Sequence, residues 1–187
     1  MAVFEDLIFE GELYSDSLQK DSFDNCTFLK CDFTKSKIIS CSLTDCNFID
    51  CNLSMTDFSQ STINNVYFKN CKILGVKFNL CNDFIFQVDF ENCILDYSSF
   101  ARRKMSKTRF KNSSLKGVDF GNADLKQSKF IKSELEEAIF YNTNLQEVDF
   151  TSAYNYSIDL SQNITKKARF SKDGLAGLLH QFDIIIE

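Results

Sequence analysis

Eight cysteines and one histidine are the residues of this chain best suited to metal binding, disulfide formation or nucleophilic catalysis. Their positions are Cys26, Cys31, Cys41, Cys46, Cys51, Cys71, Cys81, Cys93 and His180. The first seven cysteines are separated by multiples of five residues, and no CxxC pair occurs, so the spacing does not resemble a zinc site. The alternative is that each cysteine serves as a small buried apolar residue in a reducing compartment. We favour this alternative and expect neither metal nor disulfide.

The sequence gives little support to an enzyme. A catalytic triad would have to be built around His180, the only histidine, which lies near the end of the chain, where an interface role is the simpler interpretation. The chain has only 6 glycines and no glycine-rich phosphate-binding loop. We therefore expect no catalytic residues and no cofactor.

The cysteines belong to a five-residue period that runs along almost the whole chain. Large apolar residues recur every fifth position from Leu13 to Phe78, and again from Phe90 to Phe150. A period of five fits neither the 3.6 of a helix nor the 2 of a strand, so it indicates a repeat architecture. Two residues before each large residue stands a small one, usually Cys, Ser, Thr, Val or Ala, while the other three positions are mostly polar. This pattern predicts a right-angled coil made of four five-residue sides.

Four sides close one coil, so residues twenty apart stack on one face through parallel β-bridges. We expect an all-β, right-handed quadrilateral parallel β-helix whose stacked columns fill the cross-section and leave no interior pocket. Cysteines twenty apart would have parallel Cβ vectors, which is poor disulfide geometry. The absence of proline agrees, because proline would remove a ladder hydrogen bond. The predicted core columns contain Phe28, Phe48, Phe68, Phe90, Phe110, Phe130 and Phe150, with Leu95, Leu115 and Leu135 beside them.

Two places break the period. The step from Phe78 to Phe90 is two residues longer than the register allows, so we expect a bulge or short loop at 81–89, with Phe84 or Phe86 taking the inner place. Arg103 occupies a small interior position, where a buried guanidinium would be costly, so we expect a local bulge that turns it outward while Met105 fills the core. Partners often contact loops in repeat proteins, although the excess is equally consistent with a tolerated insertion. The candidate partner contacts are Asp83, Phe84, Arg102 and Arg103.

Charge is unevenly distributed along the chain. Residues 1–101 carry 7 basic and 15 acidic side chains, residues 102–133 carry 10 and 2, and residues 134–187 carry 4 and 9. The basic segment includes Arg102, Lys104, Lys107, Arg109 and Lys111 and is compatible with nucleic-acid binding. The stacking rule, however, places opposite charges in one column, as for Glu91 and Lys111 or Lys104 and Asp124, which is ordinary β-surface stabilisation. We therefore expect no direct contact with nucleic acid.

The end of the chain departs from the repeat. We expect a short helix within 172–181, followed by a β-prone strand at 182–187. A solenoid needs a cap, but this tail carries more apolar surface than a cap requires, so we favour a two-fold homodimer joined end to end. The predicted interface residues are Leu175, Leu178, Leu179, Phe182, Ile184, Ile185 and Ile186. The expected units are a start at 1–12, a stack at 13–80, the loop at 81–89, a second stack at 90–160 and the tail at 161–187.

Units such as Ala123-Asp124-Leu125 and Cys51-Asn52-Leu53 resemble the A(D/N)LXX consensus of the pentapeptide-repeat family. The resemblance covers roughly residues 13–160 and holds one register over many units. The tail from Gly177 to Ile186 resembles the closing segment of the quinolone-resistance (Qnr-type) members and of the related microcin-immunity and mycobacterial fluoroquinolone-resistance proteins.

The resemblance implies a dimeric DNA mimic that binds a type II topoisomerase, DNA gyrase or topoisomerase IV, and modulates it or protects it from quinolones or toxins. The alternative is a structural scaffold for another protein, with no DNA-like role. The acidic start of the chain and the lack of a long apolar run predict a cytoplasmic protein that does not enter a membrane.

Overall fold

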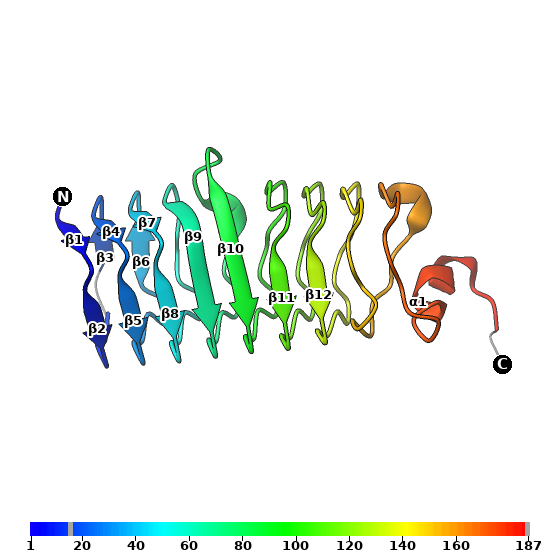
Figure 1. Ribbon diagram of the computed structural model, residues 1–187, viewed down its shortest axis with the longest axis horizontal. Helices are drawn as coiled ribbons and strands as arrows, with labels where there is room; N and C mark the ends of the chain where they lie inside the picture. Colours follow the sequence, from blue (N-terminus) through cyan, green and yellow to red (C-terminus); the bar gives the residue numbers. More distant parts are fainter. Residues whose placement is uncertain (15–16, 186–187) are drawn as a thin grey trace.

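The computed structural model describes residues 1–14 and 17–185, which form a right-handed parallel β-solenoid, as the five-residue period predicts. Figure 1 shows the coils side by side along one axis, with the N-terminus at one end and the short helix α1 at the other. The register of twenty is visible in the ladders, where Phe90 pairs with Phe110 and Phe110 with Phe130. The predicted fold class is therefore confirmed.

Most sides of the coil are too short to count as more than a three-residue strand or a single bridge. The strands are β1 (Val3–Glu5), β2 (Ile8–Glu10), β3 (Ser17–Gln19), β4 (Ser22–Asp24), β5 (Thr27–Leu29), β6 (Lys37–Ile39), β7 (Ser42–Thr44), β8 (Asn47–Ile49), β9 (Thr62–Lys69), β10 (Phe86–Glu91), β11 (Arg109–Lys111) and β12 (Lys129–Ile131). The helical turns are η1 (Phe78–Leu80), η2 (Leu160–Gln162), α1 (Ala176–Leu179) and η3 (His180–Phe182). Among the described residues, none belongs to a helix long and apolar enough to cross a lipid bilayer.

The corners of the coil have a left-handed backbone conformation. One residue in most units lies in the left-handed region, as Lys30 (φ 53°) and Asp50 (φ 55°) do. This conformation is unfavourable for most side chains, and Asn and Asp tolerate it best. The backbone N–H of the corner residue donates a hydrogen bond to the next coil. Lys30 N donates to Ile49 O and Asp50 N donates to Lys69 O, each at 2.9 Å. The ladder thus compensates for the corner strain at every coil.

Aromatic rings fill the interior in continuous columns. Phe48 stacks on Phe68 with ring centroids 5.1 Å apart, and Phe110 stacks on Phe130 at 4.9 Å. The column containing Phe28, Phe90 and Phe150 extends from Phe9 to Phe170 and meets the Phe100 column edge to face. Leu95, Leu115 and Leu135 are completely buried in the column between them. This core provides most of the apolar burial that stabilises the rod.

Where the small position holds Cys, Ser or Thr, its side chain usually donates a hydrogen bond to the neighbouring coil. Cys71 Sγ lies 3.3 Å from Phe48 O, Ser133 Oγ donates to Phe110 O at 3.2 Å, and Thr143 Oγ1 donates to Phe120 O at 2.9 Å. All eight cysteines are free buried thiols in these places. Cysteine, serine and threonine are therefore interchangeable here because each is small and can donate to a buried carbonyl.

Burial makes the stability of the protein sensitive to alkaline pH. It raises the pKa of the Cys46 thiol from the usual 9.0 to about 11. The stability linked to this thiol is complete below pH 9 and is lost as the pH rises towards 11, since the unfolded chain releases the proton first. We expect the free energy of unfolding in urea to fall across this range, and to fall less steeply in Cys46→Ser, whose hydroxyl does not titrate. Equal slopes for the two proteins would contradict this assignment.

The N-terminal coil begins earlier than the period indicates. Leu13 was expected to point inward, but it is largely exposed, and the neighbouring Tyr14 stacks on Phe33 at 4.2 Å. Phe4 and Phe9 occupy the preceding sides, where β1 pairs with β4 and β2 with β5. Residues 1–12 are thus part of the solenoid, shifted by one residue relative to the later register.

The C-terminal end of the ladder lies beyond residue 160, because Ile164 bridges to Asn144 and Arg169 to Asp149. Phe170 completes the Phe150 column at 5.2 Å, and α1 then covers the open end. Two glycines allow this close approach: a Cβ on Gly174 would lie 1.9 Å from the Tyr156 hydroxyl oxygen, and one on Gly177 would lie 2.0 Å from the Tyr156 carbonyl oxygen. The prediction of a strand at 182–187 is wrong for its described part, because Phe182 belongs to η3 and residues 183–185 form no strand; Ile186 and Glu187 lie outside the described residues.

Candidate functional site

The main irregularity of the rod is the segment between Phe78 and Phe90, where two changes are combined. The step from Phe78 to Phe86 is eight residues instead of five, and the step from Phe86 to Phe90 is four. Phe86 takes the inner position and Phe84 is exposed, so the structure selects one of the two expected alternatives. The net excess of two residues is thus a three-residue insertion, which forms the loop 81–85 after η1, followed by a one-residue deletion in β10.

Arg103 stabilises this loop from the next coil, and it does so from inside the structure. The expectation that Arg103 turns outward is wrong: the residue is buried, and its side chain is only 4% exposed. Nη1 donates to Asn82 O at 2.8 Å, and Nη2 donates to Cys81 O at 2.7 Å and to Asn79 O at 3.1 Å. The cost of burial is offset because the guanidinium donates to three carbonyls, one in η1 and two in the loop, that have left the ladder.

The charge of Arg103 is balanced at the protein surface. Nη2 lies 2.6 Å from Asp83 Oδ1, and the Asp83 side chain is 93% exposed. The guanidinium carbon lies 5.5 Å from the centre of the Phe86 ring, within the range of a cation–π contact. Nε remains without a partner, so the arrangement is held by the two terminal nitrogens. Met105 is buried in the core as expected.

The loop presents an apolar tip. Phe84 is 87% exposed, and Leu80 and Ile85 beside it in the sequence are also partly exposed. Arg102, the other predicted contact, is an exposed corner residue with φ 63°. The structure therefore places Asp83, Phe84 and Arg102 at the surface and Arg103 beneath them as the residue that fixes the loop.

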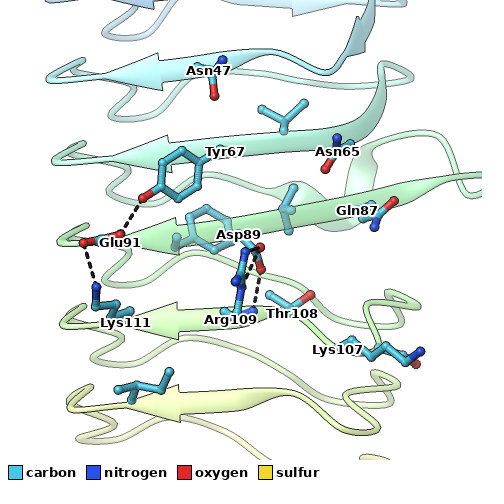
Figure 2. A pocket seen from close by; sticks show the side chains of 15 residues that line it. Asn47, Asn65, Tyr67, Gln87, Asp89, Glu91, Lys107, Thr108, Arg109 and Lys111 are labelled. Atoms are coloured by element: carbon cyan, nitrogen blue, oxygen red, sulfur yellow. Dashed lines mark hydrogen bonds and ion pairs between the residues drawn. The ribbon is translucent and has the colours of Figure 1, made fainter.

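The deletion in β10 produces a shallow hollow on the rod. Asn65 and Lys107 supply left-handed corners in the coils before and after, but β10 has no such corner residue. Figure 2 shows Asn65, Tyr67, Gln87 and Lys107 around the resulting space. The Asp89 carboxylate enters the ladder here: it accepts from Arg109 N at 2.7 Å and from Arg109 Nε at 2.9 Å.

Ion pairs across coils neutralise much of the basic segment. Beside the Asp89–Arg109 pair, Lys111 Nζ lies 3.0 Å from Glu91 Oε1 (Figure 2). The hydrogen bond from the Tyr67 hydroxyl, and then Lys111, lower the pKa of Glu91. Lys116 lies 2.9 Å from Glu136 and 3.1 Å from Glu134. Lys104 and Asp124 are bridged through the backbone but form no ion pair among the described residues.

One side of the rod has a different charge pattern. We call it face A; its inward column is Phe4, Phe23, Leu43, Ile63, Phe86, Met105, Leu125, Leu145 and Thr165. In its first three coils the outward and corner charges are all acidic, and these residues form the acidic strip: Glu5, Asp6, Asp24 and Asp45. In its last four coils five lysines form the lysine strip: Lys104, Lys107, Lys126, Lys166 and Lys167. None of these nine residues takes part in an ion pair within the described chain.

The predicted interface residues are divided between the cap and the surface. Leu178 is buried and Leu179 is half-buried, so both contribute to docking of α1 on the solenoid. Leu175, Phe182, Ile184 and Ile185 are exposed, and His180 lies beside them in η3. These four exposed apolar side chains all belong to the C-terminal segment that ends the rod.

Sequence reasoning missed three residues that shape these sites. Gly174 and Gly177 permit the contact with Tyr156, and Asp89 replaces a backbone acceptor in the ladder. Asp89 had a usable signal, since it precedes Arg109 by twenty residues. As for metal ions, the part of the chain that the structure describes has no cluster of three His, Cys, Asp or Glu side chains suited to one.

The coil with five-residue sides, the large-and-small interior and the left-handed corners define a pentapeptide-repeat solenoid. A family profile described as a pentapeptide repeat region matches residues 21–100 and 83–153, and the chain belongs to this family. No curated protein sequence matches it.

Two solved structures with this fold are trypsin-treated variants of QnrB1, described as a plasmid-mediated fluoroquinolone resistance protein. One has a TM-score of 0.69 at 18% identity and covers 98% of this chain and 99% of its own. The other has a TM-score of 0.63 at 19% identity, with 99% and 100% covered. At this identity the likeness concerns the fold.

Proposed function

We propose that this protein acts by binding, as a DNA mimic that occupies the duplex-binding surface of a type II topoisomerase such as DNA gyrase. In this role it modulates the enzyme or shields it from quinolones or toxins. The observation that carries the proposal is the acidic strip on face A, which contains no basic residue in its three coils. The full-length likeness to the fold of QnrB1, a fluoroquinolone resistance protein, supports the same choice.

The charge density of the acidic strip is similar to that of one DNA strand. The four carboxylates occupy three coils of about 4.8 Å each, with Glu5 and Asp6 in the first, so the average is one charge per about 3.6 Å along the axis. The phosphates of one DNA strand are spaced at about 3.4 Å. A basic groove that binds a phosphate backbone would therefore meet a comparable row of charges on this rod.

A competition experiment tests this surface. We expect the protein to displace fluorescent duplex DNA from gyrase, and we expect Glu5→Gln with Asp24→Asn to weaken displacement about tenfold, because two charges are lost from the row. Neither side chain makes a hydrogen bond or ion pair in the described chain, so the fold should be unaffected. Glu136→Gln with Glu137→Gln removes the same charge from another side and should retain displacement. Equal weakening by both pairs would contradict the assignment to face A.

The second candidate function is a scaffold that binds another protein. It is favoured by the cross-coil ion pairs around Arg109, Lys111 and Lys116, which form a patchwork of paired charges, and by the rigid loop that presents Phe84. In that case Phe84→Ser would abolish partner binding, and neutralising the acidic strip would not affect it.

We also propose that two copies join end to end through the exposed tail residues Leu175, Phe182, Ile184 and Ile185. Leu175→Asp with Ile184→Asp is expected to halve the mass measured by light scattering and to leave the circular dichroism spectrum unchanged, because both side chains are exposed. Leu178 is unsuitable for this test, since it is buried in the cap. An unchanged mass would show that the tail is only a cap.

A further inference from the structure

Face A separates its charges by sign along the rod, unlike the sides that carry cross-coil ion pairs. Elsewhere carboxylates and cations alternate from coil to coil and neutralise each other, as Asp89 with Arg109 and Asp149 with Arg169 do. On face A the acidic strip occupies one end and the lysine strip the other, with two uncharged coils between them at Ile63 and Phe86. Opposite charges on this face are too far apart to pair within one molecule.

The few carboxylates within the basic half are already engaged by neutral groups. Asp124 Oδ1 accepts from Asn144 Nδ2 at 2.9 Å and from Lys126 N at 3.0 Å, and Glu147 Oε2 accepts from Gln127 Nε2 at 2.9 Å. Five lysines therefore face two carboxylates in this half, and the half retains a positive charge. The opposite half carries four negative charges.

We propose that face A binds a second copy of this chain in antiparallel orientation, with the acidic strip of one rod on the lysine strip of the other. A two-fold axis crossing the rod between the two strips makes both contacts at once, because a two-fold interface brings each surface onto its counterpart. In this antiparallel orientation opposite charges meet at both ends of face A, whereas in a parallel orientation like charges would meet. The contact lies along the side of the rod and is distinct from the end-to-end contact of the tail.

The interface is electrostatic and depends on salt. All four residues of the acidic strip are exposed, as are Lys104, Lys107, Lys166 and Lys167, so screening weakens the contact as the Debye length falls from about 30 Å at low salt to about 8 Å at physiological salt. The same face carries the proposed topoisomerase-binding strip, so side-by-side pairing would cover it. The pairing itself does not depend on that function.

The test uses sedimentation velocity at low salt with the full chain carrying Leu175→Asp and Ile184→Asp, which removes the end-to-end contact. In this background, Glu5→Lys, Asp6→Lys, Asp24→Lys and Asp45→Lys together make both halves of face A basic, and Lys104→Glu, Lys107→Glu, Lys166→Glu and Lys167→Glu together make both halves acidic. We expect each reversed protein to be monomeric alone and the equimolar mixture to form a heterodimer, since opposite charges then meet at both contacts. Lys35→Glu, Lys37→Glu, Lys72→Glu and Lys77→Glu together are the matched control on other sides of the rod and should leave self-association intact.

Several outcomes would overturn the proposal. A monomeric parent protein at low salt would exclude the contact outright. Self-association that persists in both reversed proteins, or that is insensitive to salt, would assign it to another surface. Failure of the mixture to associate, with circular dichroism and unfolding midpoints unchanged, would show that charge complementarity on face A does not drive pairing.

Discussion

Replacing Arg103 by alanine is expected to destabilise the protein by about 3 kcal/mol, because it leaves buried acceptors without donors. The carbonyls of Asn79, Cys81 and Asn82 lose the guanidinium, and a cavity remains in the position of the side chain. Urea unfolding followed by circular dichroism measures the loss. Proteolysis should also become faster at 79–85, since the loop loses the contacts that fix it.

Two further variants separate the causes. Arg103→Met restores much of the volume but no donor, so it should remain less stable than the parent protein if hydrogen bonding is responsible. Arg102→Ala removes an exposed arginine one residue away and should change stability by less than about 0.5 kcal/mol. If Arg103→Met recovered the full stability, the three carbonyls would not need the guanidinium, and our explanation of the buried charge would be wrong.

Adding a methyl group at Gly177 is expected to release the C-terminal cap. The new Cβ would lie 2.0 Å from the Tyr156 carbonyl oxygen, a backbone atom that cannot move aside cheaply, and the bond from Ile158 N to Gly177 O at 2.9 Å would be lost with the displacement. We expect Gly177→Ala to cost about 2 to 3 kcal/mol in the free energy of unfolding. Hydrogen exchange should become faster throughout 172–183.

Gly121→Ala is the control for this substitution. Its nearest neighbour would be the Asp119 side chain at 3.0 Å, a group that can rotate, so its effect should be small. Because α1 carries Leu178 and is followed by the exposed apolar residues, Gly177→Ala should also abolish end-to-end association. Normal exchange rates at 172–183 in Gly177→Ala would show that the cap does not depend on this close approach.

The fold could be predicted from the sequence because the constraint is repeated in nearly every unit. Each unit buries one large and one small residue, and the same pair recurs five positions later in the next unit. Only one arrangement of the chain buries both residues in every unit. In that arrangement residues twenty apart, such as Phe110 and Phe130, stack on each other. The N-terminal shift escaped prediction because Leu13 and Tyr14 are both apolar. Only the ladder, in which Leu13 pairs with Asp32, decides which of them points inward.

Arg103 is buried where the sequence predicts exposure because a neighbouring insertion provides acceptors for its guanidinium. The small position alone indicates only the cost of burying the charge. Asp83 and Arg103 lie in neighbouring coils, so the two breaks of the period contact each other. They are one feature: the insertion withdraws carbonyls from the ladder, and Arg103 satisfies them.

The candidate surfaces were only partly predictable. The total charge of each segment is available from the sequence, but the separation of acidic and lysine strips on face A appears only when outward residues are assigned to sides. Gly174 and Gly177 gave no signal, because their role depends on the position of Tyr156, which leaves the regular register.

The most direct test of the proposed function is a gyrase supercoiling assay with and without ciprofloxacin, in which the protein and its Glu5→Gln, Asp24→Asn variant are titrated in parallel. We predict that the protein inhibits supercoiling or restores it in the presence of the drug, and that the variant requires about tenfold more protein for the same effect. An absence of effect in both arms, or identical titrations for the two proteins, would contradict topoisomerase binding through the acidic strip.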